Sequence, residues 1–438
     1  MSIIFDAAYL AALVCGSPYF LLKLATNGRY RSGLAQRLGW LNAKHEERPC
    51  IWIHGASVGE ILTVKALVKS LEKEFNKTNI VLSANTNTGL AVAEKCYRDK
   101  NVFYFPLDLS WVVDKVLRTI NPVCIILIEL EVWPNFLIEA AKKHIPVVLL
   151  NARISEKSLR WYRVLGKISP VFLESITRKE NVFCARTDVD GARLKHLGIS
   201  EAQINITGNM KYDNIVTSVP EDIQKQLHRL FEISDNDKVI VCGSTHEGEE
   251  TIILKVFKQL QEKFNKLRLI LAPRHIERVS DVIKHVESAG LRWVRRTSLG
   301  KGNIIGGQKY ETVILLDTVG ELLHVYSVAD CVFVGKSLVP QGGQNMMEPA
   351  GMAKPIIVGP HTFNFQEEMR LLHTAGAIKI VQNEQSLFCE IVALFECPDA
   401  AREMGKKAQA VVVKQQGATE RNVNVLRKIL FKERAVFV

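Results

Sequence analysis

The segment HGASVGE, residues 54–60, joins an apolar run to a helical pattern through four small residues and ends in a carboxylate. Small residues let the backbone turn tightly and approach a ligand, and free N–H groups at a helix start suit an anion. Glu60 falls in the first helical turn. There it would either complement the helix dipole, for about 0.3–1 kcal/mol, or face a cleft as a general base. The loop alone leaves these interpretations even.

Two further carboxylates, Glu129 and Glu131, lie at the end of an apolar run that begins at Val123. Alternation along a strand predicts that both side chains lie on one face. Carboxylates at the end of a buried strand are costly unless they bind polar ligand groups or cations. We therefore favour a functional role for this pair over a structural salt bridge.

Three polar loops in the second half each follow an apolar run: GSTHEGEE (243–250), APRHIER (272–278) and GGQNMMEPAG (342–351). Ser244 and Thr245 are predicted to be the N-cap and first-turn donors of a helix. Arg274, beside His275, would be the charge partner of a phosphate on these turns, and Glu348 could accept ribose hydroxyls. Three such loops in one domain predict a nucleotide site.

These loops require a scaffold that brings strand ends together. Short β-branched runs alternate with helical patterns in two series, over 50–54, 80–84, 102–105, 123–129 and 146–151, then 239–243, 268–272, 313–316, 331–335 and 355–358. Such alternation predicts parallel sheets covered on both faces. A polar, proline-containing stretch over 213–237 separates the series and is the predicted linker. Two Rossmann-like halves favour one ligand cleft between them.

Length and composition agree with a folded enzyme-sized chain. The 438 residues suggest about two to three domains. With 47% apolar and 24% charged residues the chain is globular, and its net charge of +11 favours anionic partners. Nine cysteines without a CxxC pair are interpreted as reduced core thiols, which excludes a secreted disulfide scaffold or a zinc ribbon. No GxxxxGK[ST] motif occurs, which argues against a P-loop ATPase.

The histidines of the loops, His54, His246, His275 and His361, are too scattered to form a metal ligand set. We interpret each as a hydrogen-bonding loop residue. No metal site is therefore expected.

Residues 3–22 form a nearly unbroken apolar segment whose only charge is Asp6. As a helix of ~1.5 Å rise per residue it would match a bilayer core. No basic residue precedes it, and the basic flank follows, at Lys23, Arg29, Arg31, Arg37, Lys44 and Arg48. By the positive-inside tendency the rest of the chain stays cytoplasmic. A membrane anchor is predicted; a kink at 16–18 would allow a shallow interfacial anchor, and a buried first helix is the alternative.

In this order the motifs resemble those of the Kdo (3-deoxy-D-manno-oct-2-ulosonic acid) transferases of lipopolysaccharide synthesis. The resemblance also rests on Glu-x-Glu-x-Trp-Pro-Asn (129–135), NARISEKS (151–158), TGNMKYD (207–213) and DTVGEL (317–322), and spans almost the whole chain. It implies an α/β GT-B fold, with two Rossmann-like α/β domains facing a central cleft after an N-terminal hydrophobic membrane-anchor helix. The corresponding segments are the anchor (1–24), the acceptor domain (25–212), the linker (213–237), the donor-binding domain (238–405) and a C-terminal helix packing back toward the N-terminal domain (406–438).

The resemblance also implies the reaction. Members of this family move Kdo from CMP-Kdo to lipid IVA, with inversion and without a metal or other cofactor, at the cytoplasmic face of the bacterial inner membrane. The implied partners are CMP-Kdo, lipid IVA and anionic inner-membrane lipids, which suit a basic chain. Nucleic acid is not an expected partner.

Carried over by motif position, Glu60 would be the general base that deprotonates the acceptor hydroxyl. The implied donor-binding residues are Lys211, Ser244, Thr245, Arg274, His275, Gly342, Gly343, Asn345 and Glu348. The implied acceptor-side or supporting residues are Ser57, Glu129, Glu131 and Arg153.

Three positions depart from the family pattern. Gln344 replaces a usual His, so a cationic role there is in doubt. Lys336 stands where a Gly is usual, and would either add a cation near the donor phosphate or lie on the surface. Leu130 replaces a residue that is often small and polar.

Two other functions compete with a membrane-anchored transferase. One is a soluble GT-B enzyme on another nucleotide sugar, such as an epimerase, with residues 3–22 as a buried helix. The other is a nucleotide-responsive scaffold that binds membranes through the basic flank without catalysis. Only an enzyme would lose orders of magnitude in turnover on Glu60→Gln.

Overall fold

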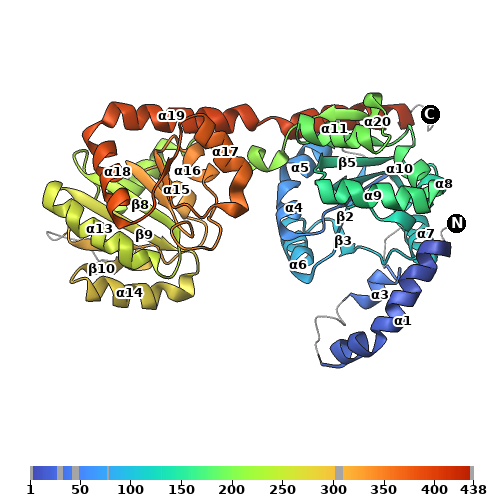
Figure 1. The fold of residues 1–438 in the computed structure, drawn as a ribbon, viewed down its shortest axis with the longest axis horizontal. Coiled ribbons are helices and arrows are strands. Elements are labelled where there is room, and N and C mark those ends of the chain that lie inside the picture. Colours follow the sequence, from blue (N-terminus) through green and yellow to red (C-terminus); the bar gives the residue numbers. More distant parts are fainter. Residues whose placement is uncertain are drawn as a thin grey trace. The chain divides into compact units, whose positions relative to one another are not determined.

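The computed structural model describes residues 3–26, 33–41, 49–75, 78–129, 131–300 and 309–434. The chain forms two compact units. Unit 1 comprises Met1–Asn214 and Gln416–Val438, and unit 2 comprises Ile215–Gln415. Each is an α/β layer structure with helices around a sheet (Figure 1).

Unit 1 contains a seven-stranded parallel sheet in the order β3-β2-β1-β4-β5-β6-β7. Its strands are β1 (Cys50–His54), β2 (Asn79–Ala84), β3 (Asn101–Tyr104), β4 (Pro122–Ile128), β5 (Val147–Ala152), β6 (Val182–Ala185) and β7 (Ile204–Ile206). Its helices are α1 (Ile3–Thr26), α3 (Leu34–Arg37), α4 (Val58–Thr63), α5 (Lys65–Glu74), α6 (Asn87–Cys96), α7 (Ser110–Ile120), α8 (Pro134–Lys142), α9 (Glu156–Ile168), α10 (Pro170–Thr177), α11 (Asp188–His196) and α20 (Ala418–Arg434). The short 3₁₀ helix η2 (Met210–Asn214) ends its first segment.

Successive residues of β1 pack on opposite faces of this sheet. Trp52 contributes to one hydrophobic core, whereas Ile51 and Ile53 contribute to the other. Burial on both faces explains why the strands are continuous apolar runs rather than alternating ones. The chain order reverses between β1 and β4, which are neighbours in the sheet.

Unit 2 repeats this design with the order β10-β11-β9-β8-β12-β13-β14, again all parallel. Its strands are β8 (Lys238–Thr245), β9 (Leu267–Pro273), β10 (Arg292–Arg295), β11 (Thr312–Leu315), β12 (Cys331–Val334), β13 (Ile356–Val358) and β14 (Lys379–Ile380). Its helices are α12 (Glu221–Leu230), α13 (Glu249–Lys263), α14 (Val279–Ser288), α15 (Leu322–Tyr326), α16 (Met347–Gly351), α17 (Gln366–Thr374), α18 (Glu384–Glu396) and α19 (Pro398–Gln415). The reversal lies between β8 and β12. The prediction of two parallel α/β domains is confirmed.

The segment expected as a linker, 213–237, contributes to both units. Asp213 belongs to η2 of unit 1, and α12 belongs to unit 2. The chain returns to unit 1 at Gln416, so α19 lies in unit 2 and α20 in unit 1.

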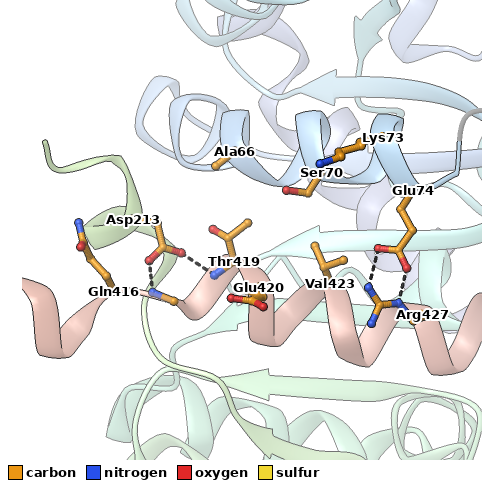
Figure 2. A pocket seen from close by; sticks show the side chains of 11 residues that line it. Ala66, Ser70, Lys73, Glu74, Asp213, Gln416, Thr419, Glu420, Val423 and Arg427 are labelled. Carbon is orange, nitrogen blue, oxygen red and sulfur yellow. Dashed lines mark hydrogen bonds and ion pairs between the residues drawn. The ribbon is translucent and has the colours of Figure 1, made fainter.

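Helix α20 is held on unit 1 at its start and again partway along its length (Figure 2). The Asp213 carboxylate accepts hydrogen bonds from the backbone N–H groups of Gly417, at 2.7 Å, and of Thr419. Further along, Arg427 pairs with Glu74 of α5. These contacts border a groove of about 800 Å³. None of the residues lining it is a candidate site residue.

The start of α1 packs on unit 1. The carboxylate of Asp6 accepts hydrogen bonds from the Ser110 backbone N–H at 2.8 Å and from Asn135 Nδ2 at 2.9 Å. The Tyr9 hydroxyl donates to Asp108 at 2.9 Å, and Phe5 meets Phe172 edge to face. The single charge of the apolar segment is therefore buried and satisfied.

No helix among the described residues combines the length and the apolar character that crossing a membrane requires.

The predicted basic flank is only partly described, because Arg29, Arg31, Lys44 and Arg48 lie outside the described residues. Arg37 donates to the Asn85 carbonyl at 2.5 Å and lies over the Tyr104 ring. Its charge is therefore engaged within unit 1.

The nine cysteines are all free thiols, and five of them are buried: Cys50, Cys124, Cys184, Cys242 and Cys331. These five fit the predicted core thiols, and the remaining four are exposed.

Candidate functional site

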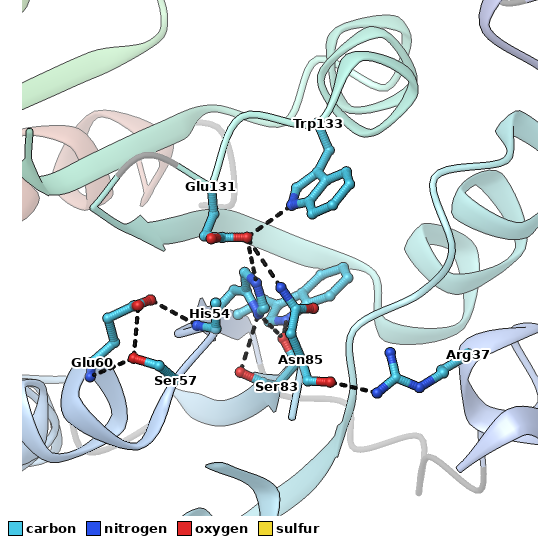
Figure 3. Close-up of polar contacts among 10 residues, drawn as sticks. Arg37, His54, Ser57, Glu60, Ser83, Asn85, Glu131 and Trp133 are labelled. Atoms are coloured by element: carbon cyan, nitrogen blue, oxygen red, sulfur yellow. Dashed lines mark hydrogen bonds and ion pairs between the residues drawn. The ribbon is translucent and has the colours of Figure 1, made fainter. Parts of the chain in front are cut away.

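The polar loops of unit 1 follow β1 and β4, at the reversal of strand order (Figure 3). In open α/β sheets such a reversal separates the two adjacent loops and leaves a crevice where ligands bind. The carboxylates singled out from the sequence lie at this edge.

Glu60 is positioned by the turn that starts α4 (Figure 3). Ser57 is the N-cap residue. Its hydroxyl donates to Glu60 Oε1 at 2.8 Å, while the Ala56 backbone N–H donates to Oε2 at 2.7 Å. These contacts fit the role of Glu60 at the helix start and fix its carboxylate at the strand edge.

The surroundings of Glu60 shift its pKa relative to that of an ordinary glutamate. Partial burial raises the pKa of this carboxyl group above its ordinary value. Hydrogen bonds from Ser57 and Ala56 oppose this, and the negative charges of Glu129 and Glu131 add to it. A carboxylate with a raised pKa is a stronger base than an ordinary glutamate.

Glu131 lies in the loop after β4 and is held at one oxygen (Figure 3). Its Oε2 accepts from Trp133 Nε1 at 2.9 Å and from Asn85 Nδ2 at 3.1 Å, and lies 3.6 Å from His54 Nε2. Burial alone would raise the pKa of Glu131, but these donors hold it below its ordinary value. Glu131 is thus a fixed anion.

His54 is the last residue of β1 and is fully buried. Its Nδ1 lies 2.9 Å from Ser83 Oγ, which also accepts from Trp52 Nε1 at 2.8 Å. Nδ1 also lies 3.1 Å from the Ser83 backbone carbonyl oxygen, which can only accept a hydrogen bond. Burial lowers the pKa of His54, which favours the neutral ring, while the neighbouring Glu131 opposes this. The predicted hydrogen-bonding role is confirmed, although in a strand rather than a loop.

The expectation that Glu129 and Glu131 share a face through strand alternation is wrong. Strand β4 ends at Ile128, and Glu129 adopts a left-handed backbone with φ 62°. Its Oε1 lies 4.0 Å from Nη1 of the buried Arg186, a partner different from those of Glu131. Arg186 follows β6, a strand outside the predicted series, and was missed for that reason.

Two other predicted cations belong to unit 1. Arg153 is exposed just after β5. Lys211 lies in η2 with its Nζ 4.9 Å from the centre of the Tyr212 ring. Lys211 is therefore in a different unit from the other predicted donor-binding residues.

In unit 2, the loops after β8 and β12 flank the reversal of strand order. The predicted N-cap role of Ser244 and Thr245 is wrong, because both belong to β8 and α13 begins at Glu249 after Gly248. Thr245 is buried, and its hydroxyl donates to Glu250 at 3.1 Å. Ser244 has φ 55° and remains partly exposed.

Glu249 organises this edge, although the sequence did not single it out. Its buried carboxylate accepts from the backbone N–H groups of Lys336 at 2.6 Å, Ser337 at 2.8 Å and Leu338 at 2.9 Å. It also accepts from the His246 N–H at 2.9 Å. The loop after β12 is thereby fixed to the loop after β8.

The remaining donor-side candidates follow β9 and precede α16. Arg274 is exposed and donates its backbone N–H to the Thr245 carbonyl at 3.0 Å; His275 beside it is exposed too. Asn345 Nδ2 donates to Glu348 Oε1 at 3.1 Å. Burial raises the pKa of Glu348, and the charge of Arg274 partly offsets this. Asn345 and Arg274 thus both act on the carboxyl group of Glu348, the first through a hydrogen bond and the second through its charge.

The glycine-rich turn requires its glycines. Gly342 and Gly343 have φ 94° and 80°, values that favour glycine. A Cβ on Gly342 would lie 2.2 Å from Asn364 Nδ2, so the turn also has no space for a side chain there.

Among the described residues, no group of three or more His, Cys, Asp or Glu side chains is arranged to hold a metal ion. The polar equipment of the two edges differs in kind. Unit 1 presents the fixed carboxylates of Glu60 and Glu131, whereas unit 2 presents Arg274, tight glycine turns and the carboxyl group of Glu348.

Comparison with known proteins shows which family has a similar sequence. The family model of 3-deoxy-D-manno-octulosonic-acid transferase (kdotransferase) matches residues 32–214. A 3-deoxy-D-manno-octulosonic acid transferase from Haemophilus influenzae is 32% identical over 92% of each chain. One from Bordetella pertussis is 31% identical over 86% of each chain.

Solved structures extend the likeness in fold. A UDP-GlcNAc 2-epimerase from Neisseria meningitidis has a TM-score of 0.57 at 17% identity, covering 87% of this chain and 100% of its own. A glycosyltransferase from Rickettsia africae has a TM-score of 0.55 at 12% identity, covering 88% and 99%. These neighbours show a GT-B-like fold and no more. The sequence relatives go further, and the chain belongs to the 3-deoxy-D-manno-octulosonic acid transferase family of glycosyltransferases.

Proposed function

We propose that this protein transfers Kdo from CMP-Kdo to the lipid A precursor lipid IVA, inverting the anomeric configuration, with Glu60 as the general base. The observation that carries the proposal is the Glu60 carboxylate, fixed by Ser57 and Ala56 at the strand reversal of unit 1 with a raised pKa. An inverting transfer needs one base on the face opposite the leaving group.

In the proposed step, Glu60 accepts the proton of an acceptor sugar hydroxyl. The hydroxyl oxygen forms the new bond to the anomeric carbon of Kdo, while the bond from that carbon to the phosphate oxygen breaks. The electron pair of the broken bond leaves with CMP, and the proton on Glu60 passes to solvent. The base is regenerated, and atoms and charge balance.

Glu131 supports the acceptor side in this proposal. Three donors converge on or near its Oε2, whereas its Oε1 has no hydrogen-bond partner among the described residues. That oxygen is suited to a second hydroxyl of the acceptor sugar. Ser57 orients the base, and Glu129 and the exposed Arg153 are further acceptor-side candidates, Arg153 toward an anionic group.

The donor would bind at the edge of unit 2. Arg274 and the turn of Gly342 and Gly343 suit the phosphate, since CMP leaves with negative charge that cations and N–H groups stabilise. Glu348, oriented by Asn345, suits the ribose hydroxyls. Ser244 and His275 remain candidates at the same edge, whereas the Thr245 hydroxyl already donates a hydrogen bond to Glu250. Lys211 would contact the donor phosphate or carboxylate from unit 1.

We also propose attachment to the cytoplasmic face of the inner membrane through α1. Ile4, Leu10 and Val14 of this helix are 50%, 43% and 70% exposed, while Phe5 and Asp6 face unit 1. An apolar outer face on a docked helix suits burial at a lipid interface.

Vesicles containing anionic phospholipid test this attachment. The double variant Leu10→Glu, Val14→Glu should lose sedimentation with vesicles, and Val413→Glu, an exposed position on α19, should keep it. Equal sedimentation of the wild type, the double variant and Val413→Glu would refute attachment through α1.

The transferase itself is tested by incubating the protein with CMP-Kdo and lipid IVA and measuring the lipid product by mass spectrometry. The proposal predicts a mass increase in Kdo units with release of CMP. Release of CMP without lipid product would contradict the acceptor. Turnover of a UDP-sugar instead, with none of CMP-Kdo, would favour an epimerase-like enzyme on the same fold.

A further inference from the structure

The loop after β12 lies at the strand reversal of unit 2. Its first residue, Gly335, donates its backbone N–H to the Gly243 carbonyl of β8 at 2.8 Å. A Cβ on Gly335 would lie 2.5 Å from the Thr245 Cα, so the loop is packed directly on the end of β8. This is the position at which open α/β sheets bind ligands.

Lys336 in this loop has a left-handed backbone, with φ 59°. Such a conformation costs a lysine free energy that a glycine would not lose. The surrounding contacts enforce it: the Lys336 N–H donates to Glu249 at 2.6 Å, and its carbonyl accepts from the Gly343 N–H at 2.7 Å. Strain of this kind concentrates at functional sites, where the fold offsets its cost elsewhere.

The backbone of the loop at Lys336 is fixed by hydrogen bonds, whereas the Lys336 side chain is partly exposed to solvent. Gly335 and Ser337 on either side are buried, whereas Lys336 is partly exposed. Throughout the part of the chain that the structure describes, its ammonium group has no ion-pair partner. Its backbone contacts the Glu249 carboxylate and, at Gly343, the turn that we assign to the donor.

We propose that Lys336 binds the phosphate of the donor nucleotide. The inference rests on the proposed function, because it takes a cytidine monophosphate ester as the ligand. A lysine ammonium is a compact point charge that suits a phosphate at the end of a central strand. The strained backbone at this position then serves to present the cation at the strand reversal.

Binding of CMP and of cytidine, measured by calorimetry, tests the proposal. Loss of one charge-assisted contact should weaken CMP binding by about tenfold in both Lys336→Gly and Lys336→Gln. Cytidine, which lacks the phosphate, should bind all proteins equally. Lys336→Gly removes the strained lysine backbone, so its melting temperature should equal or exceed that of the wild type. Lys406→Gln, at an exposed position of α19, is the control of equal charge change.

The outcomes separate this inference from the proposed function. Unchanged CMP affinity in both Lys336 variants of an active wild-type protein would overturn the role of Lys336 alone. Weaker binding of free Kdo with unchanged CMP affinity would assign the cation to a carboxylate and also overturn it. A wild-type protein that neither binds CMP nor uses CMP-Kdo would overturn both.

Discussion

The two units carry different polar side chains on the same kind of scaffold. Each unit has a parallel sheet in which the order of the strands along the chain reverses once. The reversal lies between β1 and β4 in unit 1 and between β8 and β12 in unit 2. Unit 1 carries Glu60 at the start of α4 and Glu131 in the loop after β4, and the loops of unit 2 carry Arg274 and Lys336. The scaffold thus determines where chemistry can occur, and the loop residues determine which chemistry it is.

Strained backbone marks both edges in the same way. Glu129 after β4 and Asn151 in β5 have φ 62° and 59° in unit 1, and Ser244 in β8 and Lys336 after β12 have φ 55° and 59° in unit 2. All four are non-glycine residues at strand ends. The other four non-glycine residues with positive φ, Asn121, His144, Glu232 and Ala353, lie at helix ends, where a left-handed residue is common.

The largest expected effect is the loss of turnover when the proposed base of unit 1, Glu60, is replaced. Glu60→Gln keeps a cap for α4 but removes proton transfer, so turnover should fall by about 10²–10⁴-fold at saturating CMP-Kdo. Glu156→Gln, an exposed first-turn glutamate of α9, should leave turnover unchanged in the same assay. Equal turnover of wild type and Glu60→Gln would place the base elsewhere, with Glu129 and Glu131 the next candidates.

The stability of unit 2 and its affinity for CMP should depend on Glu249, which joins the loops after β8 and β12. Glu249→Ala leaves four backbone N–H groups without their acceptor, and the free energy of unfolding should fall by about 3 kcal/mol or more. Urea unfolding and CMP calorimetry check this, with the exposed Glu247→Ala as control. A Glu249→Ala protein with wild-type stability and CMP affinity would contradict the role of this carboxylate.

The carboxylates of unit 1 should be coupled through charge. A base must be ionised, so kcat/KM falls as the pH drops through its pKa, and the raised pKa of Glu60 places this acid limb above the range of an ordinary glutamate. Glu131→Gln removes a neighbouring negative charge and should move the limb to lower pH. A pH–rate profile with the limb unmoved, or moved upward, would show that Glu131 does not act on Glu60 in this way.

The smallest effect concerns a hydroxyl that faces inward. Thr245→Val loses one hydrogen bond to Glu250, so stability should fall by about 1 kcal/mol. Because the hydroxyl is buried, CMP affinity in calorimetry should stay unchanged. A tenfold loss of CMP affinity would return Thr245 to the donor site.

The central strands and the site loops could be predicted from the sequence because burial on both faces leaves continuous apolar runs. Short strands at or near the sheet edges lack this signal: β10 and β14 are only four and two residues long and largely exposed. Strand β6, which precedes Arg186, is also only four residues long, and it was missed although it is mostly buried.

The partners of side chains could not be predicted, because the tertiary fold selects them. Glu249 is a first-turn glutamate by sequence, as Glu60 is, yet it turns away from its helix to bind the loop after β12. Ser244 and Thr245 were expected at a helix start, but β8 continues through them. His54 likewise acquires its role only from Ser83 and Glu131, which are distant in the chain.

The division of labour between the two units is tested most directly by one crossed measurement on Glu60→Gln and Arg274→Gln. CMP affinity is measured by calorimetry, and Kdo transfer by product mass, for both variants and the wild type. The account predicts that Glu60→Gln binds CMP as the wild type does and loses transfer, whereas Arg274→Gln binds CMP at least about tenfold more weakly. Glu60→Gln protein that binds CMP poorly but transfers Kdo normally would contradict it.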